Sequence, residues 1–170
     1  MNPVKEQIHP NDKDRYSVIP RVLIFLFRNN SVLLIKGSST KKLWPGKYNG
    51  LGGHLEMGED PLSAARRELK EESGLSCRTL FLCGNVIVNT GRNPGIAIYI
   101  FKGDFEGGEL SPSVEGNLEW VELDLLHQYP VVEDLRIILP MIAVRNPGAE
   151  PFYAKYFYDE EDRMQIDFTV

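Results

Sequence analysis

The segment at residues 53–75, GHLEMGEDPLSAARRELKEESGL, constrains this chain more than any other because it specifies a helix together with both of its ends. Asp60 is a favourable N-cap residue, Pro61 suits the first helical position, and Gly74 is typical of the position just past a helix end. These signals predict a helix over residues 61–72.

The second half of this predicted helix carries three glutamates on one face. Glu68, Glu71 and Glu72 are spaced i, i+3 and i+4, so their side chains are neighbours that repel one another. They also lie at the negative end of the helix dipole, where each anion is disfavoured by roughly 0.3–1 kcal/mol. A bound divalent cation would reverse both penalties. The alternative is a solvated face relieved by basic neighbours, with Arg67 paired to Glu71.

A glycine-rich loop, NGLGG at residues 49–53, precedes the helix, and Glu59 stands just before it. Glycines allow a close approach of the main chain that side chains would block. A loop carbonyl that faces helical carboxylates supplies hard oxygen ligands, which suit Mg²⁺ or Mn²⁺ and not zinc.

The pattern G-x5-E-x7-R-E-U-x-E-E-x-G-U, where U is a bulky aliphatic residue, is the signature of the Nudix hydrolases, and this chain resembles that family at every fixed position. The matching residues are Gly53, Glu59, Arg67, Glu68, Leu69, Glu71, Glu72, Gly74 and Leu75. The resemblance implies an α/β fold, a Nudix-type α/β/α sandwich with a mixed central sheet. We expect residues 1–170 to form a single domain, with a loosely ordered polar leader at 1–14.

The resemblance also implies the site. Glu68, Glu71 and Glu72 resemble the family's metal and base cluster, and Gly52 would contribute its main-chain carbonyl. Glu59 and Arg67 resemble the residues that orient the others. Which glutamate accepts the proton from water differs between members of the family, and Glu68 is our first choice. The implied cofactor is Mg²⁺ or Mn²⁺.

A further carboxylate is expected outside this segment. Glu115 precedes Trp120 by five residues and resembles the downstream glutamate of the MutT-like branch, which implies a metal ligand. The alternative is that Glu115 and Glu119 are ordinary loop charges.

The substrate is indicated by the residues around the glycine loop. Residues 48–53, YNGLGG, resemble the W-N-G-x-G-G loop of oxidised purine nucleoside triphosphatases, where the asparagine bonds to the base. Residues 115–140 and 152–159 also resemble bacterial 8-oxo-dGTP diphosphatases. Asn49, Tyr48 and Gly53 are therefore candidate substrate-binding residues. Asn49 either recognises the base, since its amide both donates and accepts, or only shapes the loop.

One departure from those relatives concerns base stacking. They usually carry a tryptophan followed by acidic residues before the last helix, whereas this chain has PVVED at residues 130–134. Val131 or Val132 occupies the aromatic position, and Tyr48 is the candidate that stacks from the other side. Glu133 and Asp134 either accept hydrogen bonds from the base edge or cap the following helix, and we favour the cap.

Three functions remain open at this point. The first is a metal-dependent nucleotide pyrophosphohydrolase that cleaves a nucleoside triphosphate, with an oxidised purine one as a candidate, to monophosphate and pyrophosphate. The second is hydrolysis of another linked nucleoside diphosphate, such as a nucleotide sugar or a dinucleoside polyphosphate. The third is a nucleotide sensor without turnover, which would not require the complete glutamate set.

Composition excludes several other classes. The net charge of −5 argues against wrapping duplex nucleic acid, which needs a basic surface. The longest apolar run, at residues 22–27, is far too short to span a membrane. Cys77 and Cys83 are predicted to be buried thiols, which is typical of a reducing compartment. We therefore expect a cytoplasmic protein that acts on a small nucleotide, and relatives suggest a possible homodimer.

The remaining pattern predicts strands that flank this helix. We expect a hairpin of strands at 17–27 and 31–36, a short strand before the glycine loop, and paired strands at 79–89 and 96–101. A strand at 118–121, helices at 123–128 and 133–144, and a final hairpin at 152–158 and 164–168 complete the prediction.

Overall fold

The computed structural model describes residues 15–39 and 43–169 of the chain. The predicted loose leader at residues 1–14 lies outside the described residues. In chain order the elements are β1 (Val18–Arg28), β2 (Ser31–Gly37), β3 (Tyr48–Asn49), α2 (Pro61–Ser73), β4 (Phe81–Val88), β5 (Gly95–Asp104), β6 (Gly116–Glu122), the 3-10 helix η2 (Leu123–Gln128), α3 (Leu135–Ala143), β7 (Phe152–Tyr158) and β8 (Met164–Thr169). Each of these elements was predicted, although the helix expected at 123–128 is a 3-10 helix.

The strands form one mixed sheet, as predicted, in the order β3-β2-β1-β5-β4-β7-β8, and β6 also pairs with β2. β1 runs parallel to β5, and β4 runs parallel to β7. The hairpins β1–β2 and β7–β8 and the pair β4–β5 are antiparallel, which matches the turns predicted between them.

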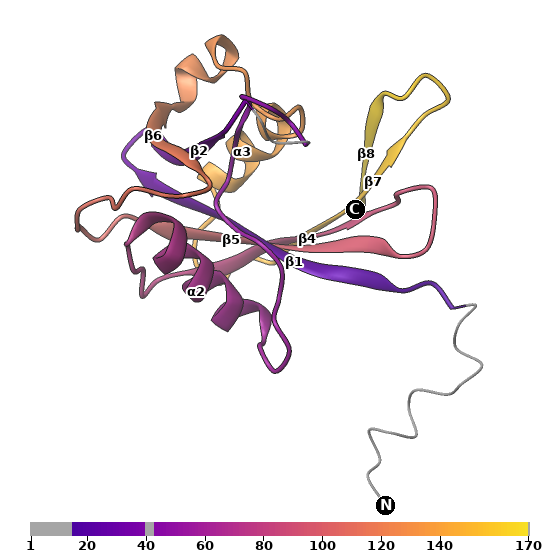
Figure 1. The fold of residues 1–170 in the computed structure, drawn as a ribbon, viewed down its shortest axis with the longest axis horizontal. Helices are drawn as coiled ribbons and strands as arrows, with labels where there is room; N and C mark the ends of the chain where they lie inside the picture. The colour runs from indigo at the N-terminus through magenta and orange to yellow at the C-terminus, as the bar shows by residue number, and fades with distance from the viewer. Residues whose placement is uncertain (1–14, 40–42, 170) are drawn as a thin grey trace, which may run out of the picture.

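Helices cover both faces of this sheet (Figure 1), and β1 shows why. Successive side chains of a strand point to opposite faces, so an uninterrupted apolar strand is buried on both sides. Ile24 packs in the cluster that contains Leu69 of α2. Its neighbour Phe25 packs in the opposite cluster, which contains Ile138 of α3. The predicted layered α/β fold is therefore confirmed.

The ends of α2 are fixed as its sequence predicts. The Asp60 carboxylate accepts hydrogen bonds from the backbone N–H groups of Leu62 and Ser63, at 2.9 and 3.0 Å. Gly74 adopts a left-handed conformation with φ of 74°, and its N–H donates to the Lys70 carbonyl. Both caps set where the helix begins and ends, and so they set the direction in which its glutamates point.

Asp134 departs from its predicted role. It occupies the N-cap position of α3, but its side chain makes no capping hydrogen bond, and the predicted side-chain cap is wrong. The carboxyl group is buried instead, with 8% of the residue exposed. This burial raises the pKa of Asp134 to about 6.

Two further expectations concern the cysteines and membrane-spanning segments. Cys77 and Cys83 are both free and buried, which confirms the predicted thiols. Within residues 15–39 and 43–169, no helix combines the length and the apolar character needed to cross a membrane.

The raised pKa of Asp134 gives a pH dependence of stability. The folded-state pKa of about 6 exceeds the ordinary 3.8, so the folded protein binds this proton more tightly than the unfolded chain does. The resulting contribution is fully present below about pH 4 and is lost as the pH rises through about 6, with a size on the order of 3 kcal/mol. Asp134→Asn should remove it. Urea unfolding between pH 4.5 and 7 measures the free energy of unfolding, and identical pH profiles for both proteins would contradict the assignment.

Candidate active site

The glutamate face of α2 and the loop after β3 line one cavity of about 670 Å³. The predicted site residues that line it are Asn49, Gly52, Gly53, Arg67, Glu68, Glu71, Glu72 and Glu115. Glu115 belongs to the segment before β6, more than forty residues from the helix in sequence. The fold thus brings together carboxylates from two distant segments.

Glu72 ties α2 to the glycine loop. Its carboxylate is buried and accepts a hydrogen bond of 2.7 Å from the Gly52 N–H. Gly52 has a φ of 141°, and a Cβ there would lie 2.2 Å from the Val22 carbonyl oxygen. Only glycine allows the loop to pass this close to β1.

Glu68 lies against the next residue of the same loop. Its side chain is 13% exposed, and a Cβ built on Gly53 would lie 2.3 Å from its Oε1 atom. The absence of a side chain at Gly53 therefore provides the space in which the Glu68 carboxylate sits.

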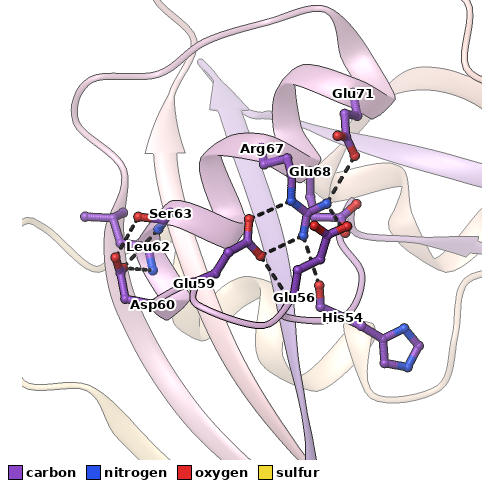
Figure 2. Close-up of polar contacts among 9 residues, drawn as sticks. All are labelled: His54, Glu56, Glu59, Asp60, Leu62, Ser63, Arg67, Glu68 and Glu71. Atoms are coloured by element: carbon purple, nitrogen blue, oxygen red, sulfur yellow. Dashed lines mark hydrogen bonds and ion pairs between the residues drawn. The ribbon is translucent and has the colours of Figure 1, made fainter.

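Arg67 is the cation that organises the neighbouring carboxylates (Figure 2). Its guanidinium donates to both oxygens of Glu59, at 2.7 and 2.9 Å. One terminal nitrogen also donates to Glu68 at 2.9 Å and to Glu71 at 3.1 Å, and the other donates to the His54 carbonyl at 3.0 Å. The hydrogen bonds from Arg67 lower the pKa of Glu59 to about 2. The hydrogen bonds that Arg67 makes with Glu59, Glu68 and Glu71 raise the pKa of Arg67 in turn.

The donor chemistry of the cavity fits a hard divalent cation. Glu68, Glu71, Glu72 and Glu115 offer carboxylate oxygens, and Gly52 lines the same cavity with its main chain. Within the described residues, no group of three or more His, Cys, Asp or Glu side chains is gathered closely enough to form a preassembled metal centre. The arrangement brings the oxygen donors to one cavity without converging them on one point.

The residues considered for base stacking lie in the interior. Tyr48 is 6% exposed, and Val131 and Val132 are each 4% exposed. The Tyr48 hydroxyl donates to Glu119 at 2.5 Å, and its ring meets Tyr129 edge to face at 5.3 Å. Burial, together with the Glu119 carboxylate, raises the pKa of the Tyr48 hydroxyl to about 12.

The other candidate substrate contacts are placed as follows. Asn49 lines the cavity, but its side-chain oxygen accepts a hydrogen bond from the Gly50 N–H at 2.8 Å, so it also shapes the loop. Glu133 is exposed, 3.8 Å from the Lys47 ammonium group. Neither Glu133 nor Asp134 lines the cavity.

Sequence reasoning did not assign several residues that line the cavity. They include Arg21, Leu43, Trp44, Lys47 and Val114. The backbone of Arg21 on β1 forms an isolated antiparallel β-bridge with that of His54, which directly follows the glycine loop. The segment around Trp44 carries a clear turn signal, but nothing in its spacing connects it to the helix or to residue 114.

A family model described as "NUDIX domain" matches residues 18–142. The chain therefore belongs to the Nudix hydrolase family, as its glutamate motif predicted. Its fold is MutT-like. The MutT protein of Bacillus halodurans superimposes with a TM-score of 0.74 and 21% identity, over 89% of this chain and 97% of that protein. The NUDIX domain of Shewanella oneidensis NrtR, solved with ADP ribose, superimposes with a TM-score of 0.62 and 14% identity, over 83% and 97% of the two chains.

Curated relatives carry more specific names. The oxidized purine nucleoside triphosphate hydrolase of Danio rerio is 37% identical over 103 residues, which are 60% of this chain and 65% of that protein. The NAD-capped RNA hydrolase NudC of Pseudomonas aeruginosa is 26% identical over 136 residues, which are 78% of this chain and 47% of that protein. The match thus spans less than two thirds of the length of either relative.

Gly53→Ala should lower activity without unfolding the protein. The added Cβ would displace the Glu68 carboxylate, which is the flexible end of a side chain, and the Gly53 backbone needs no left-handed conformation. A displacement of about 1 Å at a reacting group costs on the order of 100-fold in turnover. Steady-state turnover and thermal unfolding measure the two effects.

Gly58→Ala is the matched control for this variant. A Cβ at Gly58 meets nothing within 4 Å, but φ there is 91°, so the substitution strains the same loop without touching Glu68. Equal loss of turnover in both variants would show that any disturbance of the segment between β3 and α2 lowers activity, and that the Glu68 position is not the cause.

Proposed function

We propose that this protein is a metal-dependent nucleotide pyrophosphohydrolase that cleaves a nucleoside triphosphate to the monophosphate and pyrophosphate. The observation that carries the proposal is the cavity that Glu68, Glu71 and Glu72 line together with the glycine loop and Glu115. The chain's family membership agrees with this chemistry.

Electrostatics explains why the reaction needs such a site. A phosphoanhydride is kinetically stable because its negative oxygens repel an incoming nucleophile. A divalent cation, when bound, neutralises that charge and makes hydroxide available near neutral pH. Glu68, Glu71, Glu72, Glu115 and the Gly52 carbonyl are the groups that would hold Mg²⁺ or Mn²⁺ here.

The residues of the chain carry out the remaining steps. Water adds to a phosphorus atom of the anhydride, the bridging oxygen leaves with the other phosphate group, and a carboxylate takes the proton released by the water. We propose that Glu68 accepts this proton, because Gly53 and Arg67 fix the position of its carboxylate. Arg67 also holds Glu71, and Glu59 anchors Arg67 in turn.

An oxidised purine nucleoside triphosphate is the first candidate substrate. Its support is the oxidized purine nucleoside triphosphate hydrolases of Danio rerio and Mus musculus, at 37% and 34% identity over the matched residues. A second candidate is another linked nucleoside diphosphate, which the match to an NAD-capped RNA hydrolase favours. A sensor without turnover is the third.

Further proposals concern the organisation of the chain. We propose a single domain, a cytoplasmic location and no association with duplex nucleic acid. A homodimer is one candidate assembly, and sedimentation equilibrium of the purified protein measures the oligomeric state.

A nucleotide panel separates these functions. Purified protein with Mg²⁺ is incubated with normal and oxidised purine nucleoside triphosphates, a nucleotide sugar, a dinucleoside polyphosphate and NAD, and the released phosphates are quantified. The proposal expects pyrophosphate and monophosphate from a triphosphate. Cleavage restricted to the linked diphosphates favours the second candidate, and nucleotide binding with no cleavage favours the sensor.

Glu72→Gln should lower turnover by about 100-fold or more, because it removes a ligand charge at little change in shape. The fold should remain, with thermal unfolding within a few degrees of wild type. Glu160→Gln, an exposed glutamate in the β7–β8 turn, is the matched control and should retain full activity. A Glu72→Gln protein that turns over normally, or that fails to fold, would refute this role.

A further inference from the structure

Part of the cavity lining is apolar and exposed. Leu43, Trp44 and Val114 line the cavity, and they are 57%, 37% and 103% exposed. Large apolar side chains that gather at a cavity mouth are typical of a ligand-binding surface. The glutamates and Arg67 line the same cavity, so it combines a charged region with an apolar one.

A tight turn holds Trp44 at this position. Pro45 and Gly46 occupy its centre, Gly46 has a φ of 70°, and the Lys47 N–H donates to the Trp44 carbonyl at 3.1 Å, which are the features of a type II turn. The Lys47 carbonyl in turn accepts from the Gly37 N–H at the end of β2. The turn is therefore joined to the central sheet.

The imidazole of His54 also lines the cavity, but the described residues offer no second large aromatic ring there. Among those that line the cavity, Trp44 is the only Phe, Tyr or Trp. Tyr48 is buried against Tyr129, and Trp120 packs under the Arg28 guanidinium, 4.3 Å from its ring centroid. The stacking position that the sequence assigned to residues 131 and 132 is buried and apolar.

We propose that Trp44 is the base-stacking residue of the site, with the nucleobase against its indole and the phosphates at the glutamates. This assignment rests on the proposed function, because it requires a nucleotide in the cavity. A nucleobase is the occupant that fits, since it is a flat π-system attached to the polyphosphate that the charged region attracts. Every base has a π-face, so Trp44 contributes affinity for nucleotides as a class.

Kinetics test the assignment first. Trp44→Ala should raise KM for the best nucleotide of the panel by about tenfold to a hundredfold and change kcat by less than about threefold. Trp44→Phe should restore most of the affinity. Leu125→Ala is the control, because Leu125 is also 37% exposed but does not line the cavity. An unchanged KM in Trp44→Ala, or an equal rise in Leu125→Ala, overturns the proposal.

Fluorescence tests it without turnover. The chain has two tryptophans, so indole emission is compared between the wild-type protein and Trp44→Phe, each titrated with a non-hydrolysable nucleoside triphosphate analogue or with inorganic tripolyphosphate in Mg²⁺. The nucleotide should quench emission only where Trp44 is present, and tripolyphosphate should quench neither protein. Nucleotide quenching that is equal in both proteins overturns the stacking assignment.

The two experiments separate this assignment from the proposed function. If the wild-type protein cleaves no phosphoanhydride but the Trp44-dependent quenching is observed, the hydrolase proposal fails and the base site stands. If triphosphates are cleaved and the nucleotide gives no Trp44-dependent quenching, the hydrolase proposal stands and the base site fails.

Discussion

Charge repulsion among the glutamates of α2 is the constraint on which the rest of the site depends. Three carboxylates on one helical face, near the negative end of the helix dipole, are unfavourable together unless positive charge reaches them. Arg67 supplies one positive charge through its bonds to Glu68 and Glu71, and Glu59 fixes the guanidinium from the other side. One guanidinium does not balance all of these carboxylates, and the remaining negative charge is the reason we propose a divalent cation at this site.

The glycine loop makes this cluster possible. Gly52 passes too close to β1 for any side chain, and Gly53 leaves the space that Glu68 fills. The Gly52 N–H then donates to Glu72, so the loop and the helix hold each other in place. The core beneath them, built on the two faces of β1, keeps the loop and α2 on the same side of the sheet.

Local signals explain which parts of this arrangement could be predicted. The ends of α2 follow from Asp60, Pro61 and Gly74, because capping depends on a few consecutive residues. The hairpins follow from their turns in the same way. The mixed character of the sheet, by contrast, came from the family resemblance. The strand order was not predicted, since strand spacing alone does not place β1 beside β5.

Long-range packing explains the features that could not be predicted from the sequence. Asp134 has the residue type and position of a cap, but packing around α3 buries its carboxyl group, and no local pattern records that burial. Trp44 and Val114 lie seventy residues apart in sequence and line one cavity only because the fold brings both loops to it. The predicted metal and catalytic roles of the glutamates depend on the ion itself, which requires a direct measurement.

Mn²⁺ binding, followed by electron paramagnetic resonance of the free ion, tests the central claim most directly. Wild-type protein should bind Mn²⁺, and a variant with Glu68, Glu71 and Glu72 all changed to glutamine should lose that binding while keeping its circular dichroism spectrum. Equal binding by the two folded proteins would show that the ion is held elsewhere, and the account of the cluster as a metal site would be wrong.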